Sequence, residues 1–411
     1  MAQLNITLNE EEILHLMQTD RTDAFKKILE TSLNQFLKAE SKEQLNAERY
    51  ERTEVRTDSR NGSYTRTLTT RLGTITLAVP RHRNIPFKSM VFDNYSTSEA
   101  ALITAMAEMV VNGVATRKVG KVMETLCGRS FSKSSVSETC KELDKSVLEF
   151  KNKPLTVDYP FVCLDATYFS VRENHKVISK SLYIAYATNA KGVRDIIGFH
   201  VYPAETKVYW TEFLAWLKSK GLKGVKMFTS DAHEGIRHAM NNIFPEVPWQ
   251  RCQFHFLKNI VDQVPKSYQK GISSELTGMF NSITIEEARK KRDRIINDYN
   301  DIAEKAMECL DKGFESAMTV MLLPEELRVT FRTSNHLERL NKEIKRRSKA
   351  IGIFPNVESL TRLMGAVMLE RNEVLQQRVH PLFFAPTYTK LLSIEDELKK
   401  AAEEQRGMLV A

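Results

Sequence analysis

Residues 159–171 read YPFVCLDATYFSV, and this stretch decides which fold the sequence predicts. Its apolar run, residues 161–164, is typical of a buried β-strand, and Asp165 follows the run directly. A second run of the same character, residues 225–230 (VKMFTS), leads into Asp231. An acid at the end of a buried strand is poorly solvated and favours a cation, so two such acids side by side can hold divalent metal ions.

The segments that follow predict the order β-β-β-α-β-α-β-α, which is the order of a ribonuclease-H-like α/β domain with a mixed sheet. In that layout the first and fourth strands are neighbours. Asp165 and Asp231 would then meet although 231 − 165 = 66 residues separate them. The predicted strands cover residues 159–171, 181–187, 195–202, 224–229 and 249–254, and the predicted helices cover residues 208–218 and 232–243, with a further helix after residue 254.

Glu338 is the expected third acid, and it lies in a basic segment with helical spacing, residues 334–342 (SNHLERLNK). Ser334 can cap this helix at its N-terminus. On the helix, Asn335, Glu338 and Lys342 share one face. The neighbouring apolar face, which can pack on the sheet, is formed by Leu337, Leu340 and Ile344.

Less specific interpretations of the same acids stay open. Asp231 alone could cap the helix that follows it, and Glu338 could be an ordinary surface residue. Glu343 is a weaker candidate for the third acid, because it lies five positions farther on and about 140° around the helix. A site is favoured because two acids on strands predicted to be adjacent are combined with a third on a later helix.

Length and composition restrict the class of protein. A chain of 411 residues is too long for one ordinary core, and 42% hydrophobic with 9% aromatic residues is typical of a globular protein. No apolar run is long enough for a membrane span, and no export signal is visible at the N-terminus. Five scattered cysteines indicate reduced thiols in the cytoplasm. The net charge of +8 favours a polyanionic partner, and basic residues concentrate at residues 52–88 and 332–349.

The N-terminal region predicts a helix and then a basic β-hairpin. Residues 10–40 have helical spacing of Phe25, Leu29, Leu33 and Phe36, which suits packing or oligomerisation. Residues 64–70 and 74–79 predict the hairpin, which is expected to end at Pro80. The hairpin could lie along a DNA groove, or its face could simply be solvated. Its candidate DNA contacts are Arg66, Arg81 and Arg83.

Residues 113–148 predict two helices with a turn at Gly128, the second helix running from Ser134 or Ser135 to Val147. Such a helix-turn-helix element can bind DNA, although the same pattern is common in purely structural bundles. The apolar face of the first helix comprises Val119, Val122, Met123 and Leu126. The candidate phosphate contacts are Arg117, Lys118, Lys121 and Lys133.

Residues 266–328 predict an α-helical insertion between the second and third acids. Thr284 and Glu287 form a capping box, and the helix that follows has an apolar face that includes Ile302. Four residues are expected to pack the core of the insertion: Met279, Phe280, Met318 and Met321.

Cys252 and His255 have the spacing of half a zinc site, but no second Cys/His pair stands at a suitable distance along the chain. His255 is therefore expected to support the acids or the insertion. A Walker-type phosphate loop and a dinucleotide fingerprint are both missing from the sequence, so no nucleotide cofactor is expected.

These patterns predict six regions. The predicted regions are an N-terminal helical part at 1–50, a DNA-binding part at 51–150, a first catalytic part at 158–265, the helical insertion at 266–328, a second catalytic part at 329–384, and a C-terminal tail without a motif at 385–411.

Several segments resemble the Mutator-like (MULE-type) transposases of bacterial insertion sequences, in the right order and through nearly the whole chain. The segments are residues 79–83 (VPRHR), 165–172 (DATYFSVR), 230–235 (SDAHEG), 249–255 (WQRCQFH), 332–341 (RTSNHLERLN) and 352–356 (GIFPN). The resemblance implies a transposase of the DDE class with a ribonuclease-H-like catalytic domain. By motif match, Asp165, Asp231 and Glu338 are the catalytic and metal-binding acids.

The resemblance also places other residues. Cys252 and His255 fall on the Cys/Asp-x-x-His element of the family, and His233, Asn335 and Arg339 are expected to support the site. On the helix of the third acid, the residues expected to face phosphates are Lys342, Lys345 and Arg346.

The implied reaction needs two divalent ions, Mg²⁺ with Mn²⁺ as a substitute. The enzyme would bind terminal inverted repeats of double-stranded DNA, cleave the ends by hydrolysis and join the 3′-hydroxyl to target DNA. A homodimer or higher oligomer in the cytoplasm, associated with the nucleoid and without a membrane, is expected. The alternatives are a ribonuclease-H-like nuclease or resolvase without strand transfer, and a domesticated DNA-binding regulator that uses residues 52–148.

Overall fold

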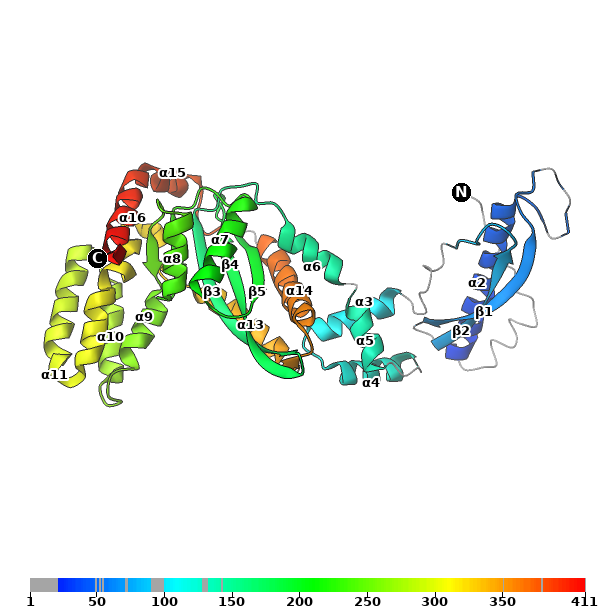
Figure 1. Ribbon diagram of the computed structural model, residues 1–411, viewed down its shortest axis with the longest axis horizontal. Helices are drawn as coiled ribbons and strands as arrows, with labels where there is room; N and C mark the ends of the chain where they lie inside the picture. The colour runs from blue at the N-terminus through cyan, green and yellow to red at the C-terminus, as the bar shows by residue number, and fades with distance from the viewer. Residues whose placement is uncertain are drawn as a thin grey trace. The chain divides into compact units, whose positions relative to one another are not determined.

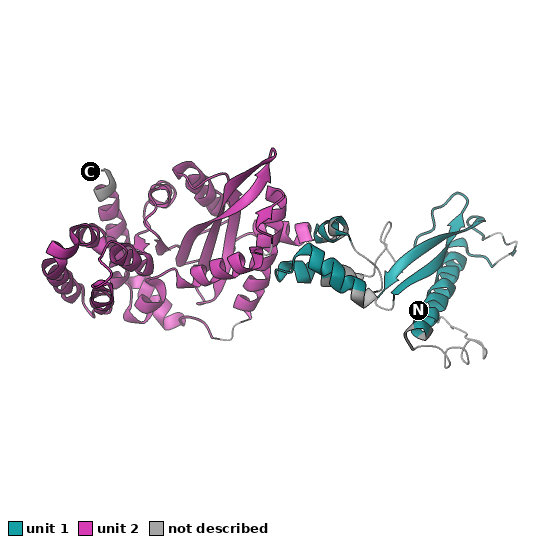
Figure 2. Cartoon of the chain, turned by 90° about the horizontal axis from the view of Figure 1, so that it is seen from below, with its two compact units in different colours: residues 1–142 teal, residues 143–411 magenta. Residues whose placement is uncertain are grey.

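The computed structural model describes most of the chain (Figure 1). The described residues are 21–48, 50–51, 53, 55–70, 73–89, 100–127, 132–141, 143–349, 351–377 and 380–410. The chain divides into two compact units, Met1–Glu142 and Leu143–Ala411, which Figure 2 colours separately. No helix within the described ranges combines the length and apolar character needed to cross a lipid bilayer.

The first unit contains helix α2 (Arg21–Leu45) and an antiparallel pair of strands, β1 (Arg60–Thr70) and β2 (Gly73–His82). The alternating residues of β2 are buried as the sequence predicts, and α2 packs on them through Leu29, Leu33 and Leu37. The prediction that Phe25 lies on this face is wrong, since its side chain is 58% exposed. The face of α2 that packs on β2 extends from Leu29 to Leu37. The buried residues of β2 are Ile75, Leu77 and Val79.

Strand β2 also runs past its predicted end. Pro80 pairs with Ser63, and the strand continues to His82. The free edge of β2 is occupied by α2, since Asn34 accepts a hydrogen bond from the Ala78 N–H at 2.7 Å and donates one to the Thr76 carbonyl at 3.2 Å. A side chain thus satisfies backbone groups that an exposed edge strand would leave unpaired.

Three further helices of the first unit share a small core: α3 (Ala100–Val111), α4 (Thr116–Cys127) and α5 (Lys133–Cys140). The core residues are Met106, Val119, Met123 and Val136. Val122, predicted to lie on this face, is 41% exposed. The predicted second helix is also wrong in length: α5 ends at Cys140, and a separate helix α6 (Leu143–Asn152) begins the second unit.

The second unit is built on a mixed sheet with strand order β5-β4-β3-β6-β7, in which β8 also pairs with β3. Strands β3, β4 and β5 are antiparallel, whereas β6 and β8 run parallel to β3, and β7 runs parallel to β6. The predicted order of elements and the adjacency of the first and fourth strands are confirmed. The elements are β3 (Phe161–Glu173), β4 (Lys176–Thr188), β5 (Arg194–Tyr202), α7 (Lys207–Ser219), β6 (Met227–Ser230), α8 (Glu234–Ile243) and β7 (Trp249–Arg251).

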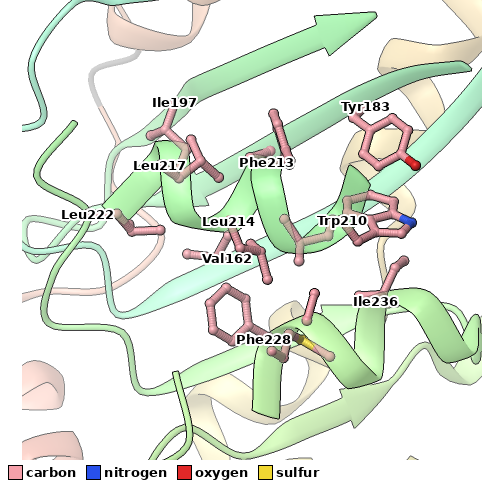
Figure 3. Close-up of a cluster of buried hydrophobic side chains, with 14 of the residues drawn as sticks. Val162, Tyr183, Ile197, Trp210, Phe213, Leu214, Leu217, Leu222, Phe228 and Ile236 are labelled. Atoms are coloured by element: carbon pink, nitrogen blue, oxygen red, sulfur yellow. The ribbon is translucent and has the colours of Figure 1, made fainter. Parts of the chain in front are cut away.

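Helices α7 and α8 pack against one face of this sheet around a large buried cluster (Figure 3). The predicted apolar face of α7 is confirmed, since Trp210, Phe213, Leu214 and Leu217 are completely buried. Replacing a buried aromatic of this kind with alanine costs about 3–5 kcal/mol. This cluster is therefore the main apolar support for the strands that carry the acids.

Alternation along β3 decides which side chains face away from this cluster. Val162 and Leu164 point into it, whereas Phe161 packs on the opposite face and stacks on Phe331 with ring centroids 3.7 Å apart. Because side chains alternate along a strand, Asp165 has the parity of Phe161 and faces away from α7 and α8.

A helical region follows β7, as predicted. It contains α9 (Gln253–Val261), α10 (Gln269–Phe280), α11 (Ile285–Ala317), a 3₁₀ turn η1 (Thr319–Leu322) and α12 (Glu325–Phe331). Thr284 caps α11 by accepting the Glu287 N–H at 3.2 Å, and Met279, Phe280 and Met318 are buried in the core. Ile302 is 38% exposed, contrary to prediction; it precedes a break in helical geometry at Ala303.

The C-terminal part contains α13 (Asn335–Ser348), β8 (Ile353–Phe354), α14 (Val357–Gln376), α15 (Ala385–Ser393) and α16 (Glu395–Val410). Residues 385–410, predicted as a tail, are helices whose Leu391 and Leu398 share a buried cluster with Phe161. Gln405 of α16 bonds to both the N–H and the carbonyl of Trp249, at 2.8 and 2.9 Å. It thereby covers backbone groups of the edge strand β7.

Candidate active site

The sheet brings Asp165 and Asp231 together. Strands β3 and β6 pair in parallel up to Cys163 and Thr229, and each acid lies two residues beyond that pair. Neighbouring strands are about 4.8 Å apart, so the two acids lie at matching positions on the same face. Burial, and then the charge of Asp231, raise the pKa of Asp165 to about 7, although the nearby His255 partly opposes this.

Helix α13 docks onto the first acid. Asn341 donates from Nδ2 to Asp165 Oδ2 at 2.6 Å, and Glu338 lies three residues earlier on the same helix. The predicted apolar face is confirmed, because the side chains that hold α13 in place are almost completely buried: Leu337, Leu340 and Ile344. Residues three apart share a helix face, so Glu338 is directed toward the same side of β3 as Asp165. Asp165 lies inside β3 and not at the strand end that the sequence had suggested, because the strand continues to Glu173 in its pairing with β4.

Cys252 and His255 lie beside Glu338. His255 Nε2 is 3.8 Å from Glu338 Oε1. The Cys252 thiol raises the pKa of His255 to about 9 against the effect of burial, and both Glu338 and Asp165 add to the rise. Burial favours the neutral thiol of Cys252, but His255 and Ser334 beside it outweigh burial and lower its pKa.

Two predicted capping residues have other roles. Ser334 precedes α13 without capping it through its side chain; its hydroxyl donates to Cys252 Sγ at 3.2 Å instead. His233, not Asp231, caps α8, because its Nδ1 accepts the Gly235 N–H at 3.1 Å. The same nitrogen lies 3.7 Å from Glu205 Oε1.

Glu343, the weaker candidate for the third acid, is engaged elsewhere. It accepts hydrogen bonds from Arg346 and Arg347 at 2.7–2.8 Å, and these arginines lower its pKa to about 2. Arg346, predicted to face phosphates, is thus bonded to Glu343. Four other residues of this helix, predicted to support the site or to face phosphates, are exposed or partly exposed: Asn335, Arg339, Lys342 and Lys345.

Sequence reasoning missed two residues at the site. Asn341 could have been found from its spacing of three from Glu338, but an asparagine carries no distinctive pattern. Glu205 follows β5 and adds to the rise in the pKa of Asp165. It is held by hydrogen bonds from the Tyr168 hydroxyl at 2.8 Å and Trp210 Nε1 at 3.2 Å. Nothing in its local sequence distinguishes it from other loop acids.

The basic residues predicted to contact DNA in the first unit have different environments. Arg81 stacks on the Tyr64 ring at 4.8 Å, and Arg66 is half-buried. The side chain of Lys133 lies outside the described part of the chain. The remaining candidates are exposed: Arg83, Arg117, Lys118 and Lys121. Their contact with DNA stays a prediction.

Comparison with known proteins identifies the class. Residues 1–377 match the model of the family described as "Transposase, Mutator family". The transposase for insertion sequence element IS256 in transposon Tn4001 of Staphylococcus aureus is 41% identical over 91% of this chain and 96% of its own. The transposase for ISRM5 of Rhizobium meliloti is 36% identical over 85% of this chain and 88% of its own.

A third relative, the transposase for IS1081 of Mycobacterium tuberculosis, is 33% identical over 85% of each chain. The protein is thus a transposase, an enzyme that cuts and joins DNA. It belongs to the Mutator family of transposases, as the resemblance implied.

Proposed function

We propose that this transposase is of the DDE class and that its second unit is a ribonuclease-H-like catalytic domain. The catalytic acids would be Asp165, Asp231 and Glu338. It would bind the terminal inverted repeats of an insertion sequence, cleave the element ends by hydrolysis and join the freed 3′-hydroxyl to target DNA. The observation that carries this proposal is the parallel pairing of β3 and β6, with α13 bonded to Asp165 through Asn341.

The residues present fit divalent ions. Asp165 and Asp231 are close enough for one to raise the pKa of the other, so a positive charge is favoured between them. Glu338 Oε1 is buried and accepts no hydrogen bond from the described residues. Carboxylate oxygens are ligands that Mg²⁺ prefers, and Mn²⁺ takes the same type of donor. When bound, the ions would activate the attacking oxygen and neutralise charge at the phosphate.

The chain's own side chains would orient these groups. Asn341 donates to Oδ2 of Asp165 and the Ala166 N–H donates to Oδ1 at 2.9 Å, so the carboxylate is fixed while each oxygen keeps a lone pair for a ligand. His255 lies 3.8 Å from Glu338, and its raised pKa favours the charged form that would donate to a phosphate oxygen of the DNA. The exposed Lys342 and Lys345 on the same helix would attract the backbone of double-stranded DNA. Two element ends must be handled together, so we expect a homodimer or higher oligomer.

The decisive experiment uses purified full-length protein with inverted-repeat DNA and a target plasmid in Mg²⁺. Cleavage and joining should fall by about 10²–10³-fold or more in Asp165→Asn, Asp231→Asn and Glu338→Gln, while DNA binding persists. Glu343→Gln is the matched control on the same helix, and it should remain active because Glu343 is bonded to arginines.

Two outcomes would contradict the proposal. Wild-type cleavage by any of the three acid variants would remove that acid from the site. Cleavage by the wild type without joined products from precut ends would instead indicate a nuclease or resolvase.

A further inference from the structure

Cys252, His255 and Glu338 form a compact cluster of side chains of the types that bind metals, close to Asp165. One ligand atom from each lies within 4.8 Å of the other two, and His255 Nε2 lies 3.8 Å from Glu338 Oε1. A tetrahedral ion with bonds of about 2.0–2.3 Å places its ligands roughly 3.3–3.8 Å apart. A side-chain movement of about 1 Å would therefore close this cluster around an ion.

One polar atom of the cluster lacks a hydrogen-bond partner. Glu338 Oε1 is buried and accepts no hydrogen bond from the described residues. Leaving a buried polar group unpaired is unfavourable, and such a group in a native structure indicates a ligand or a functional role. The cluster therefore has both a geometry that suits a metal ion and a buried polar atom that such an ion would satisfy.

Cys252 is placed to act as a thiolate. It precedes α9 as its N-cap residue, and its sulfur accepts hydrogen bonds from the backbone N–H and the hydroxyl of Ser334 at 3.3 and 3.2 Å. Ser334 is itself the N-cap residue of α13. Two helix N-termini and two donors therefore surround the sulfur, and this environment stabilises the anionic form that binds metals.

We propose that Cys252, His255 and Glu338 bind Zn²⁺ or a similar thiophilic divalent ion, at a site separate from the Asp165–Asp231 pair. Thiolate and imidazole ligands select zinc over magnesium, and three protein ligands leave a fourth position for water. The sequence offers no second Cys/His pair to complete this site. In the structure the third ligand is the carboxylate of Glu338, which lies 338 − 255 = 83 residues after His255.

The site has a consequence for catalysis, and this part rests on the proposed function. Glu338 would be shared between the two sites. An ion held by Cys252 and His255 would draw the Glu338 carboxylate away from Asp165 and Asp231, so Zn²⁺ would inhibit Mg²⁺-dependent cleavage. The binding itself does not depend on the DNA chemistry.

The test titrates Co²⁺, a coloured substitute for Zn²⁺, into the full-length protein without DNA or Mg²⁺. We expect one equivalent to produce a thiolate-to-cobalt charge-transfer band, which Zn²⁺ abolishes and excess Mg²⁺ does not. Cys252→Ser should remove the band and weaken Zn²⁺ binding by more than about 100-fold, since even loss of an outer-shell partner costs about 10- to 100-fold. The matched control is Cys309→Ser, which removes a half-buried thiol of α11 and should keep the band.

Because Cys252 is completely buried, its replacement could prevent folding. His255→Gln replaces a partly exposed ligand and should weaken Zn²⁺ binding in a protein whose thermal unfolding remains cooperative. Asp165→Asn should retain the band, because that acid belongs to the other pair. A folded wild type without the band, a band that survives Cys252→Ser, or a band lost in Asp165→Asn would overturn the proposal. Zinc binding by a protein that fails to cleave inverted-repeat DNA would instead contradict only the proposed function.

Discussion

At the scale of single residues, Asp165 is the acid whose environment most directly links folding to function. Folding raises its pKa from 3.8 to about 7, through burial first and then the charge of Asp231. Between these values the folded state holds a proton that the unfolded state lacks, so the free energy of unfolding falls as the pH rises from about 4 to 7. Above pH 7 the full penalty, of order 2–4 kcal/mol, is present.

We therefore expect Asp165→Asn to stabilise the protein in EDTA while it removes cleavage. Thermal unfolding at pH 5 and pH 8 measures the effect: the variant should exceed the wild type chiefly at pH 8, because asparagine has no charge to bury. Added Mg²⁺ should raise the unfolding temperature of the wild type and leave that of the variant unchanged. If the wild type is at least as stable as the variant at pH 8 in EDTA, burial and the charge of Asp231 do not raise the pKa of Asp165.

The positions of the three acids could be predicted from the sequence because each follows from a strong local pattern. Asp165 and Asp231 end apolar runs, and Glu338 lies on a helix whose apolar face is unambiguous. The partners of these acids could not be predicted. Glu205 and Asn341 reach the site through tertiary packing, and Ser334 bonds to a sulfur 82 residues away instead of capping its own helix. Side chains that act through long-range contacts leave no periodic trace in a sequence.

At the scale of elements, the contact of α6 with α14 depends on a glycine. A methyl group at Gly365 would overlap Val147 Cγ1 and lie 3.0 Å from Phe199 Cζ, both of which are buried. The same change at Gly278 in α10 would meet nothing within 4 Å. The two positions therefore separate helix propensity from close packing.

We expect Gly365→Ala to destabilise the protein by about 1–3 kcal/mol, because overpacking outweighs the better helix propensity of alanine. Gly278→Ala should stabilise it by up to about 1 kcal/mol, since only the propensity changes. Denaturant unfolding of both variants is the measurement. Equal effects at the two sites would mean that α6 does not pack against Gly365.

Elements with a regular apolar pattern were predicted well, and those set by long-range contacts were not. The order of strands and helices from β3 to α9 follows the periodicity of the sequence. The break between α5 and α6 does not, because α6 is held by α14, where Arg362 bonds to Asp144 at 2.6 and 2.8 Å. Strand β8 has only two residues, Ile353–Phe354, and the sequence pattern of so short a strand is indistinguishable from a loop.

At the scale of the whole molecule, the proposed catalytic and metal-binding side chains all lie within the second unit, and the basic candidates of the hairpin and helical region lie within the first. The C-terminal helices belong to the second unit as well, since Lys226 next to β6 pairs with Glu395 at 2.7 Å and Gln405 bonds to Trp249. The second unit thus contains the side chains needed for the proposed chemistry.

The division at residues 142 and 143 predicts which fragment folds. The sequence favoured a boundary at residues 151–158, which would leave α6 outside the catalytic part. In the structure Val147 of α6 is buried, Asp144 pairs with the nearly buried Arg362, and Lys220 Nζ donates to the Lys151 carbonyl at 2.6 Å. Removing α6 would expose an apolar surface and take away the Asp144 carboxylate to which Arg362 donates, which together cost about 3 kcal/mol or more.

We expect a fragment of residues 143–411 to unfold cooperatively and a fragment of residues 153–411 to be less stable by at least that amount, or to aggregate. Circular dichroism during heating of both fragments makes the comparison. A matched control in the longer fragment is Asp144→Asn with Val147→Ala, which keeps the helix but removes its two main contacts, and it should resemble the shorter fragment. If the two fragments unfold at the same temperature, α6 is a linker rather than part of the catalytic unit, because no contact of Val147 or Asp144 would then contribute to its stability.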